Sequence, residues 1–114
     1  MSKPDITRVN KPWGYEEIWA HTDKYVGKLL HIKAGSRLSL QYHEVKEETI
    51  YVLQGDLVLL TDKKRITLPP GSVYHISPGD FHRFTAGAAP VTLIEVSTPE
   101  LDDVVRVEDD HGRA

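Results

Sequence analysis

The sequence predicts an all-β protein, either a small antiparallel β-barrel or a jelly roll, and three observations support this fold class. Turn-forming residues recur at short intervals along the chain. Between them lie short runs rich in β-branched and aromatic residues, and several of these alternate polar and apolar side chains as half-buried strands do. No segment before Pro99 keeps the apolar 3.6-residue period of a helix, so no long helix is expected.

The expected strands follow one another in order, because a turn signal separates most neighbouring runs. Ala34-Gly35 ends the second run, Gly55-Asp56 lies between the fourth and fifth, and Pro78-Gly79 precedes the eighth. We expect roughly six to ten strands, as small barrels and jelly rolls have. The strand-like runs are residues 15–19, 25–33, 37–43, 49–54, 56–61, 65–68, 72–76, 82–85 and 91–97.

Residues 1–114 are expected to form one domain, because the chain has the usual length of a single core. We assign the barrel to about residues 25–98, an N-terminal arm to residues 1–24 and an acidic tail to residues 99–114. The tail is expected either to carry a short helical turn or to pack along the barrel.

Composition excludes several classes of function. The net charge of −3 gives no basic surface for nucleic acid, and the absence of cysteine excludes disulfides, thiolate metal sites and a cysteine nucleophile. No apolar run has the length of a signal peptide or a membrane span. We therefore expect a cytoplasmic protein that binds neither nucleic acid nor membranes.

Four residues form a possible metal site. Gln41 and His43 lie two apart on an expected strand and share a face, and Glu48 precedes the next strand. His82 follows the Pro78-Gly79 turn. Two imidazoles, a carboxylate and an amide oxygen suit a borderline divalent metal such as zinc, manganese, iron, cobalt or nickel.

A simpler interpretation is that these residues are solvent-exposed or structural, since glutamine and glutamate are common on surfaces. The spacing alone leaves both interpretations open. Lys46 and Glu47 are expected in a charged turn, and Glu47 is the rival of Glu48 if that turn is one residue shorter.

At these residues the sequence resembles the cupin superfamily. The first cupin motif is matched by Gly35, Gln41, His43, Glu48 and Gly55, and Pro78, Gly79 and His82 resemble the second. The resemblance implies an RmlC-like jelly roll with Gln41, His43, Glu48 and His82 as the metal ligands. Most cupins have histidine where Gln41 stands.

Glutamine at that position is similar to the type II mannose-6-phosphate isomerases, whose cupin domain often follows a mannose-1-phosphate guanylyltransferase. The sequence KPWG at residues 11–14 resembles that family's Arg-Pro-Trp-Gly, and residues 102–113 resemble its closing Asp-Asp-Ile-x-Arg segment. The likeness covers residues 11–113. It implies a divalent cofactor, zinc first, and a sugar phosphate as the small-molecule partner.

The resemblance also assigns roles in substrate binding. Lys28 is expected to contact the substrate in catalysis, and its strand parity with Leu30 and Ile32 directs it into the barrel. Arg106 and Arg113 resemble the family's terminal arginines and suit phosphate binding. Arg113 is also expected to take part in catalysis. The alternatives are a solvated lysine and arginines paired with the acidic tail.

Three functions remain open at this stage. The first is metal-dependent aldose–ketose isomerisation of a phosphorylated sugar, like that of mannose-6-phosphate isomerase. The second is an iron(II) dioxygenase built on two histidines and a carboxylate. The third is a non-catalytic module that binds a sugar or a metal. We also expect a homodimer, in which residues 15–19 pair across a two-fold axis.

Overall fold

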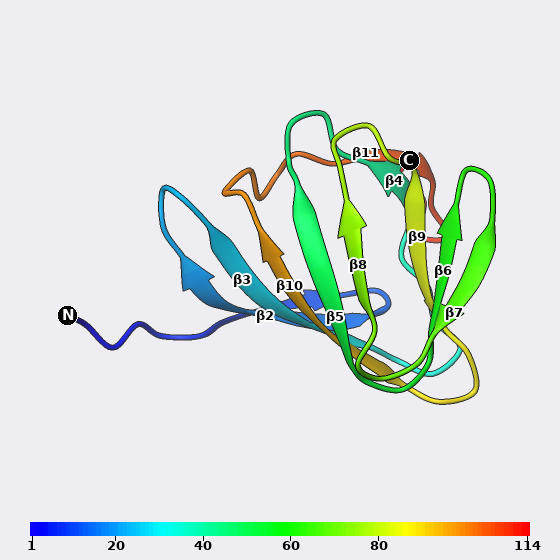
Figure 1. The fold of residues 1–114 in the computed structure, drawn as a ribbon, viewed down its shortest axis with the longest axis horizontal. Helices are drawn as coiled ribbons and strands as arrows, with labels where there is room; N and C mark the ends of the chain where they lie inside the picture. Colours follow the sequence, from blue (N-terminus) through cyan, green and yellow to red (C-terminus); the bar gives the residue numbers. More distant parts are fainter.

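The computed structural model describes residues 1–114 and is built of two antiparallel sheets without a helix (Figure 1). This confirms the all-β prediction, although the eleven strands exceed the expected six to ten. The structure therefore contains no helix that could cross a membrane. The strands are β1 (Thr7–Lys11), β2 (Gly14–His21), β3 (Val26–Ile32), β4 (Leu40–Tyr42), β5 (Glu48–Gln54), β6 (Leu57–Thr61), β7 (Arg65–Leu68), β8 (Val73–Ile76), β9 (His82–Ala86), β10 (Val91–Ser97) and β11 (Val105–Glu108).

The two sheets have different sizes and mix distant parts of the chain. One has the order β1-β2-β3-β10-β5-β8 and the other the order β11-β4-β9-β6-β7. Nine strands correspond to the nine predicted runs, and β1 and β11 are additional. Both additional strands lie at sheet edges, where a strand needs only one partner and shows a weaker apolar pattern.

The two terminal segments are parts of these sheets. Strand β2 pairs with β1 on one side and with β3 on the other, so the segment expected to pair across a two-fold axis has no free edge. The tail supplies β11, which pairs with β4, and it contains no helix.

The hydrophobic core lies between the sheets and is formed by alternate residues of the central strands. Ile50, Val52, Leu57, Leu59 and Leu93 are completely buried. Gly55, the last glycine of the first motif, turns the chain at the end of β5 with a φ of 75°. A Cβ there would lie 2.2 Å from the carbonyl oxygen of Pro90, so this turn requires glycine. At the end of the barrel opposite this turn, the side chains that point inward are charged instead of apolar.

Candidate metal centre

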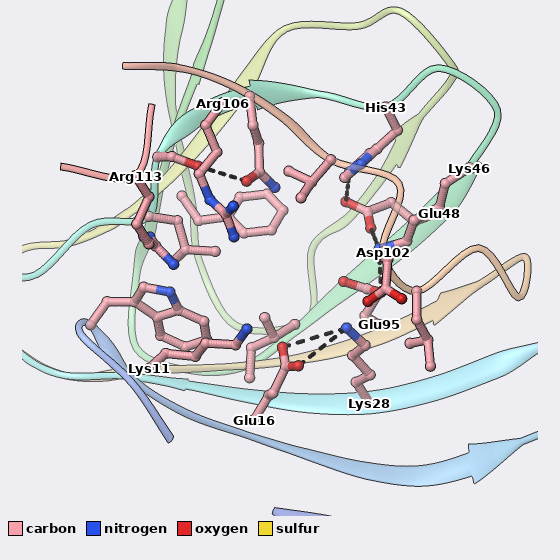
Figure 2. Close-up of a pocket in the computed structure, with 18 residues that line it drawn as sticks. Lys11, Glu16, Lys28, His43, Lys46, Glu48, Glu95, Asp102, Arg106 and Arg113 are labelled. Carbon is pink, nitrogen blue, oxygen red and sulfur yellow. Dashed lines mark hydrogen bonds and ion pairs between the residues drawn. The ribbon is translucent and has the colours of Figure 1, made fainter. Parts of the chain in front are cut away.

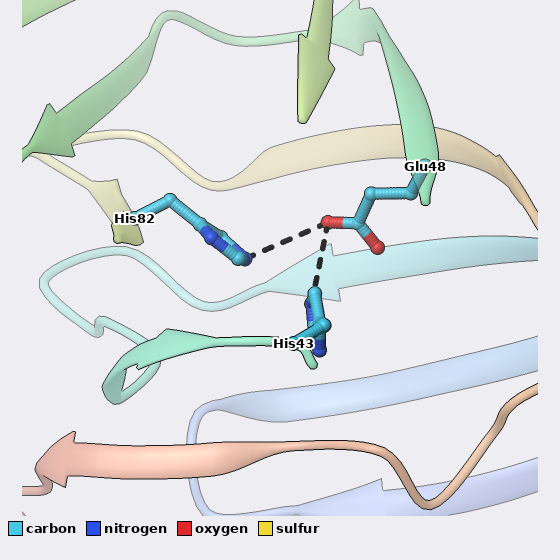
Figure 3. A group of neighbouring side chains, drawn as sticks. All are labelled: His43, Glu48 and His82. Carbon is cyan, nitrogen blue, oxygen red and sulfur yellow. Dashed lines mark ion pairs between the residues drawn. The ribbon is translucent and has the colours of Figure 1, made fainter. Parts of the chain in front are cut away.

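Three of the predicted ligands converge between the two sheets (Figure 3). His43 follows β4, Glu48 begins β5 and His82 begins β9. Glu48 Oε1 lies 3.9 Å from His43 Nε2 and 3.6 Å from His82 Nε2. Ligand atoms bound to one ion at about 2.1 Å are about 3.0–3.5 Å apart, so these separations fit a shared ion after small movements.

The two imidazoles are oriented as metal-binding histidines are. His43 Nδ1 is hydrogen-bonded to the carbonyl oxygen of Asp103, and His82 Nδ1 lies 2.9 Å from that of Asp80. Because a carbonyl only accepts, each Nδ1 carries the proton and each Nε2 presents a lone pair. Both Nε2 atoms and Glu48 Oε1 are buried without a hydrogen-bond partner. Three orphaned polar atoms in one place fit a bound cation.

The electrostatics also favour a cation. Burial lowers the pKa of His82 to about 4, and burial followed by the charge of Lys46 lowers the pKa of His43. Both rings are therefore neutral at pH 7, which is the form that binds metal. Burial and then Glu95 raise the pKa of Glu48, and a divalent ion would supply the charge that favours its ionised form.

Gln41, the fourth predicted ligand, lines a cavity together with His43 and Glu48. Its backbone pairs with His82 on one side and Arg106 on the other. Its amide oxygen accepts a hydrogen bond from Ser39 Oγ at 2.8 Å. Its role as a ligand stays a prediction.

Lys46 lies in the charged turn that the sequence predicted, between β4 and β5, but its side chain points into the molecule. Lys46 Nζ lies 3.0 Å from Glu48 Oε2 and 3.1 Å from Glu95 Oε2, and its side chain is 6% exposed. Glu47, the rival of Glu48, points outward and pairs with His75 at 2.9 Å. Of the two glutamates, Glu48 is therefore the one that faces the histidines.

Glu95 is a second buried carboxylate that the sequence analysis did not single out. Burial raises its pKa, but the charges of Lys46 and then Lys28 outweigh burial and leave the pKa below its usual value. Burying such charges contributes little net stability, because desolvation offsets most of the attraction. Buried titratable groups gathered in a cavity are typical of a functional site.

His43, Lys46, Glu48 and Glu95 line a cavity of about 260 Å³. This volume is close to the lower end of the range for small-molecule pockets. Its charged lining is nearly balanced in sign. The cations are Lys11, Lys28, Lys46, Arg106 and Arg113, and the carboxylates are Glu16, Glu48, Glu95 and Asp102.

The cavity has two ends (Figure 2). His43, Lys46, Glu48 and Glu95 lie together on one side, here called the inner end. Lys11, Arg106 and Arg113 lie on the opposite side, here called the outer end.

The outer end offers positive charge to a ligand. Lys11 and Arg106 form no ion pair, and Arg106 Nε is buried without a hydrogen-bond partner. Arg113 instead donates to Asp109 through Nε at 2.9 Å and Nη2 at 3.0 Å. The alternative of pairing with the acidic tail thus describes Arg113 and not Arg106.

Lys28 enters the barrel, as its strand parity predicted. Its side chain is 8% exposed, and Nζ lies 3.4 Å from both carboxylate oxygens of Glu16. Figure 2 shows this pair on the wall between the two ends of the cavity.

Asp103 ties the C-terminal segment to the loop that carries the candidate ligands. Its carboxylate accepts hydrogen bonds from the backbone N–H groups of Glu44, Val45 and Lys46 at 3.0, 2.7 and 2.8 Å. Its carbonyl holds His43, as described above. Those N–H groups also lower the pKa of Asp103, that of Lys46 most. A single tail residue therefore positions both His43 and Lys46.

Comparison with known families supports the resemblance drawn from the motifs. Residues 3–109 match the family described as mannose-6-phosphate isomerase C-terminal. The chain belongs to this family. The matched residues include His43, Glu48 and His82 of the candidate metal centre and most of the residues that line the cavity.

Curated relatives include a mannose-1-phosphate guanylyltransferase of Escherichia coli strain K12, 35% identical over 117 residues. Another is the alginate biosynthesis protein AlgA of Pseudomonas aeruginosa, 31% identical over 109 residues. Each alignment covers 92% of this chain and 23% of the relative. The chain thus spans about a quarter of the length of these relatives.

Solved structures confirm the cupin jelly roll. An RmlC-like cupin from Shewanella frigidimarina superposes with a TM-score of 0.75 at 15% identity, covering 82% of this chain and 84% of that one. A sugar phosphate isomerase of the cupin superfamily from Silicibacter pomeroyi has a TM-score of 0.64 at 25% identity, covering 73% of this chain and 59% of that one.

Proposed function

We propose that this protein is a metal-dependent aldose–ketose isomerase of a sugar phosphate, with mannose 6-phosphate or a close relative as substrate. The observation that carries the proposal is the pairing of two features in one cavity. Buried metal-ligand atoms without partners lie at the inner end, and cations without ion pairs lie at the outer end. A sugar phosphate has a reacting carbonyl at one end and a phosphate at the other.

The outer end would bind the phosphate. Arg106 supplies a guanidinium, which recognises phosphate oxygens by forked hydrogen bonds, and Lys11 adds a point charge. Arg113 would join them, although it is already held by Asp109. Phosphate bound there directs the opposite end of the sugar toward His43 and Glu48.

The isomerisation moves a proton from C2 to C1 and a second proton from O2 to O1. Through an enediol it requires a base within hydrogen-bond reach and a group that stabilises the negative oxygen. Glu95 is our choice of base, because its carboxylate lines the inner end and the two lysines keep it ionised. Lys28 and Lys46 are the cations placed to stabilise the oxygen.

His43, Glu48 and His82 would hold the divalent ion, with Gln41 as a fourth ligand. A bound ion would act as a Lewis acid on the substrate oxygen. Zinc is our first expectation, because imidazole and carboxylate are among its usual ligands. Manganese, iron, cobalt and nickel also suit this set.

A second candidate is an iron(II) dioxygenase, which the two histidines and one carboxylate favour. The cations of the outer end favour the sugar phosphate instead, because oxygen activation requires no such row of charges. Iron that copurifies and supports oxygen uptake would favour the dioxygenase.

The test is an isomerisation assay on the purified protein with a panel of hexose and pentose phosphates. The chain is first freed of metal with a chelator and then reloaded with each divalent ion separately. We expect conversion of mannose 6-phosphate to its ketose only after reloading. A metal-loaded protein that converts no member of the panel would favour the non-catalytic binding module.

A further inference from the structure

One carboxylate in the lining of the cavity has no partner. Four carboxylates line this cavity, and Glu16, Glu48 and Glu95 each have a lysine nitrogen within 3.4 Å. Asp102, the fourth, forms no ion pair, and its side chain takes part in no hydrogen bond. Both of its oxygens therefore keep their lone pairs free for a ligand.

Asp102 adjoins the inner end of the cavity, and its environment differs from that of Glu95. Figure 2 labels Asp102 on the same side as Lys46, Glu48 and Glu95, and all four line the same cavity. Glu95 is 3% exposed and lies 3.1 Å from the Lys46 ammonium group, whereas Asp102 is exposed. Two carboxylates in different environments can take two different roles in one reaction.

The neighbours of Asp102 fix its position. Two backbone hydrogen bonds close the turn that carries it, from the Asp103 N–H to the carbonyl of Glu100 at 3.3 Å and from the Val104 N–H to the carbonyl of Asp102 at 3.0 Å. The carboxylate of Asp103 also binds the backbone of residues 44–46, as described above. Asp102 is thus held beside the inner end, and a catalytic group needs such a fixed position.

The proposed isomerisation moves two protons, and Glu95 accounts for only the one that passes from C2 to C1. The other passes from O2 to O1, so its carrier must accept a proton and then return it. An ammonium group has no lone pair, which excludes Lys28 and Lys46. The Nε2 lone pairs of His43 and His82 face the candidate metal centre. Asp102 is therefore the group at this end that meets the requirement.

We propose that Asp102 is a second catalytic carboxylate, which carries the hydroxyl proton of the sugar from O2 to O1. This inference rests on the proposed isomerisation. As Glu95 removes the proton from C2, the C–H electron pair forms the C1–C2 double bond and the carbonyl pair moves onto O1. Asp102 takes the proton from O2 and delivers it to O1, which leaves the negative charge on O2. O2 then forms the new carbonyl as C1 takes the proton from Glu95, and both carboxylates end as they began.

The test is Asp102→Asn, which keeps the shape of the side chain but replaces the carboxylate with an amide that is not basic. Because Asp102 is exposed, thermal unfolding and metal content after dialysis should match those of the wild type. The kcat for the sugar phosphate should fall by about a hundred-fold, as when a general acid–base group is removed. Asp62→Asn, which changes an exposed aspartate in the turn between β6 and β7, is the matched control and should keep the wild-type kcat.

Exchange in heavy water separates a proton carrier from a residue that only supports the fold. In Asp102→Asn, Glu95 still removes the proton from C2, but most of the intermediate returns to the aldose because its hydroxyl proton is not carried onward. The deuterium found at C2 of the recovered aldose, relative to the ketose formed, should therefore rise by about ten-fold.

Two outcomes would overturn the role of Asp102 while leaving the isomerase proposal intact. One is a wild-type kcat in Asp102→Asn, and the other is a loss of exchange and of conversion in equal proportion. A metal-loaded wild type that neither converts nor exchanges any sugar phosphate would overturn both proposals.

Discussion

The inner and outer ends of the cavity are built differently. At the inner end, His43, Lys46 and Glu48 lie within 4 Å of a neighbour and are nearly inaccessible, as is the adjoining His82 of the candidate metal centre. At the outer end, Lys11 and Arg106 have no ion pair. The inner end is thus ordered before any ligand arrives, which is what chemistry requires. The outer end keeps positive charge available for recognition.

The two ends of the cavity are also formed by different segments of the chain. Inner residues come from β5, from β10 and from the loop that joins β4 to β5, whose flanking strands are held in the two sheets. Outer residues come from the end of β1 and from the tail. Substitutions at the inner end should therefore affect metal binding and rate, whereas those at the outer end should affect substrate affinity.

The largest effect is expected from removing an inner ligand. His43→Ala should abolish both turnover and tight metal binding, because the ion loses a ligand and the Lewis acid is dismantled. Metal content after dialysis and the isomerisation rate are measured together. His75→Ala, an exposed histidine that pairs with Glu47, is the matched control and should behave as wild type. Equal metal content in both variants would remove His43 from the site.

The next effect concerns the wall between the two ends. Lys28→Ala should keep the ion but lower kcat by roughly a hundred-fold, the loss seen when an oxyanion donor is removed. The change also leaves Glu16 without its partner, so thermal unfolding must accompany the kinetics. Glu16→Gln is the comparison that breaks the same pair while keeping the lysine. An unchanged kcat in folded Lys28→Ala would make its role structural.

Sequence patterns predicted the candidate ligands His43 and Glu48 but not every residue of the inner end. Gly35, His43, Glu48 and Gly55 follow a spacing that local turns enforce, and Lys28 follows from strand parity. Parity also contains the signal for Glu95, an acid at an inward position between the buried residues Leu93 and Ser97. The inward direction of the Lys46 side chain was not predicted, because the conformation of this turn depends on Asp103, a residue far along the chain.

At the outer end, Arg106→Ala should raise KM for the sugar phosphate by about ten- to a hundred-fold, the value of a hydrogen bond to a charged group. Arg113→Ala should have a smaller effect, because Asp109 already occupies its guanidinium. Neither change should alter the affinity for a sugar without phosphate. Steady-state kinetics with a phosphorylated and an unphosphorylated sugar separate these outcomes, and equal losses for both would contradict phosphate recognition.

The smallest effect is expected from the link between tail and ligand loop. Asp103→Asn weakens three hydrogen bonds that the carboxylate accepts from backbone N–H groups, and the loss of groups that hold metal ligands in position lowers metal affinity about ten-fold. Metal titration of the variant measures this loss. An affinity equal to that of the wild type would show that the link does not position the ligands.

The lowered pKa of Asp103 also predicts that the stability difference between the wild type and Asp103→Asn depends on pH. The pKa of Asp103 is lowered in the folded protein, so its ionised carboxylate stabilises the fold above the unfolded value of about 3.9. That stabilisation is lost as the pH falls through the lower folded pKa. The difference in unfolding free energy between wild type and Asp103→Asn should therefore be full at pH 6 and shrink below about pH 4. A difference that does not change with pH would contradict this role.

The central claim is tested most directly by running the reaction in heavy water with metal-loaded protein and mannose 6-phosphate. Proton transfer through an enediol exposes the migrating proton to solvent. We predict deuterium at C1 of the ketose and at C2 of the recovered aldose, and none after chelation or in His43→Ala. Metal bound at the inner end, with neither conversion nor exchange for any sugar phosphate tested, would contradict the claim.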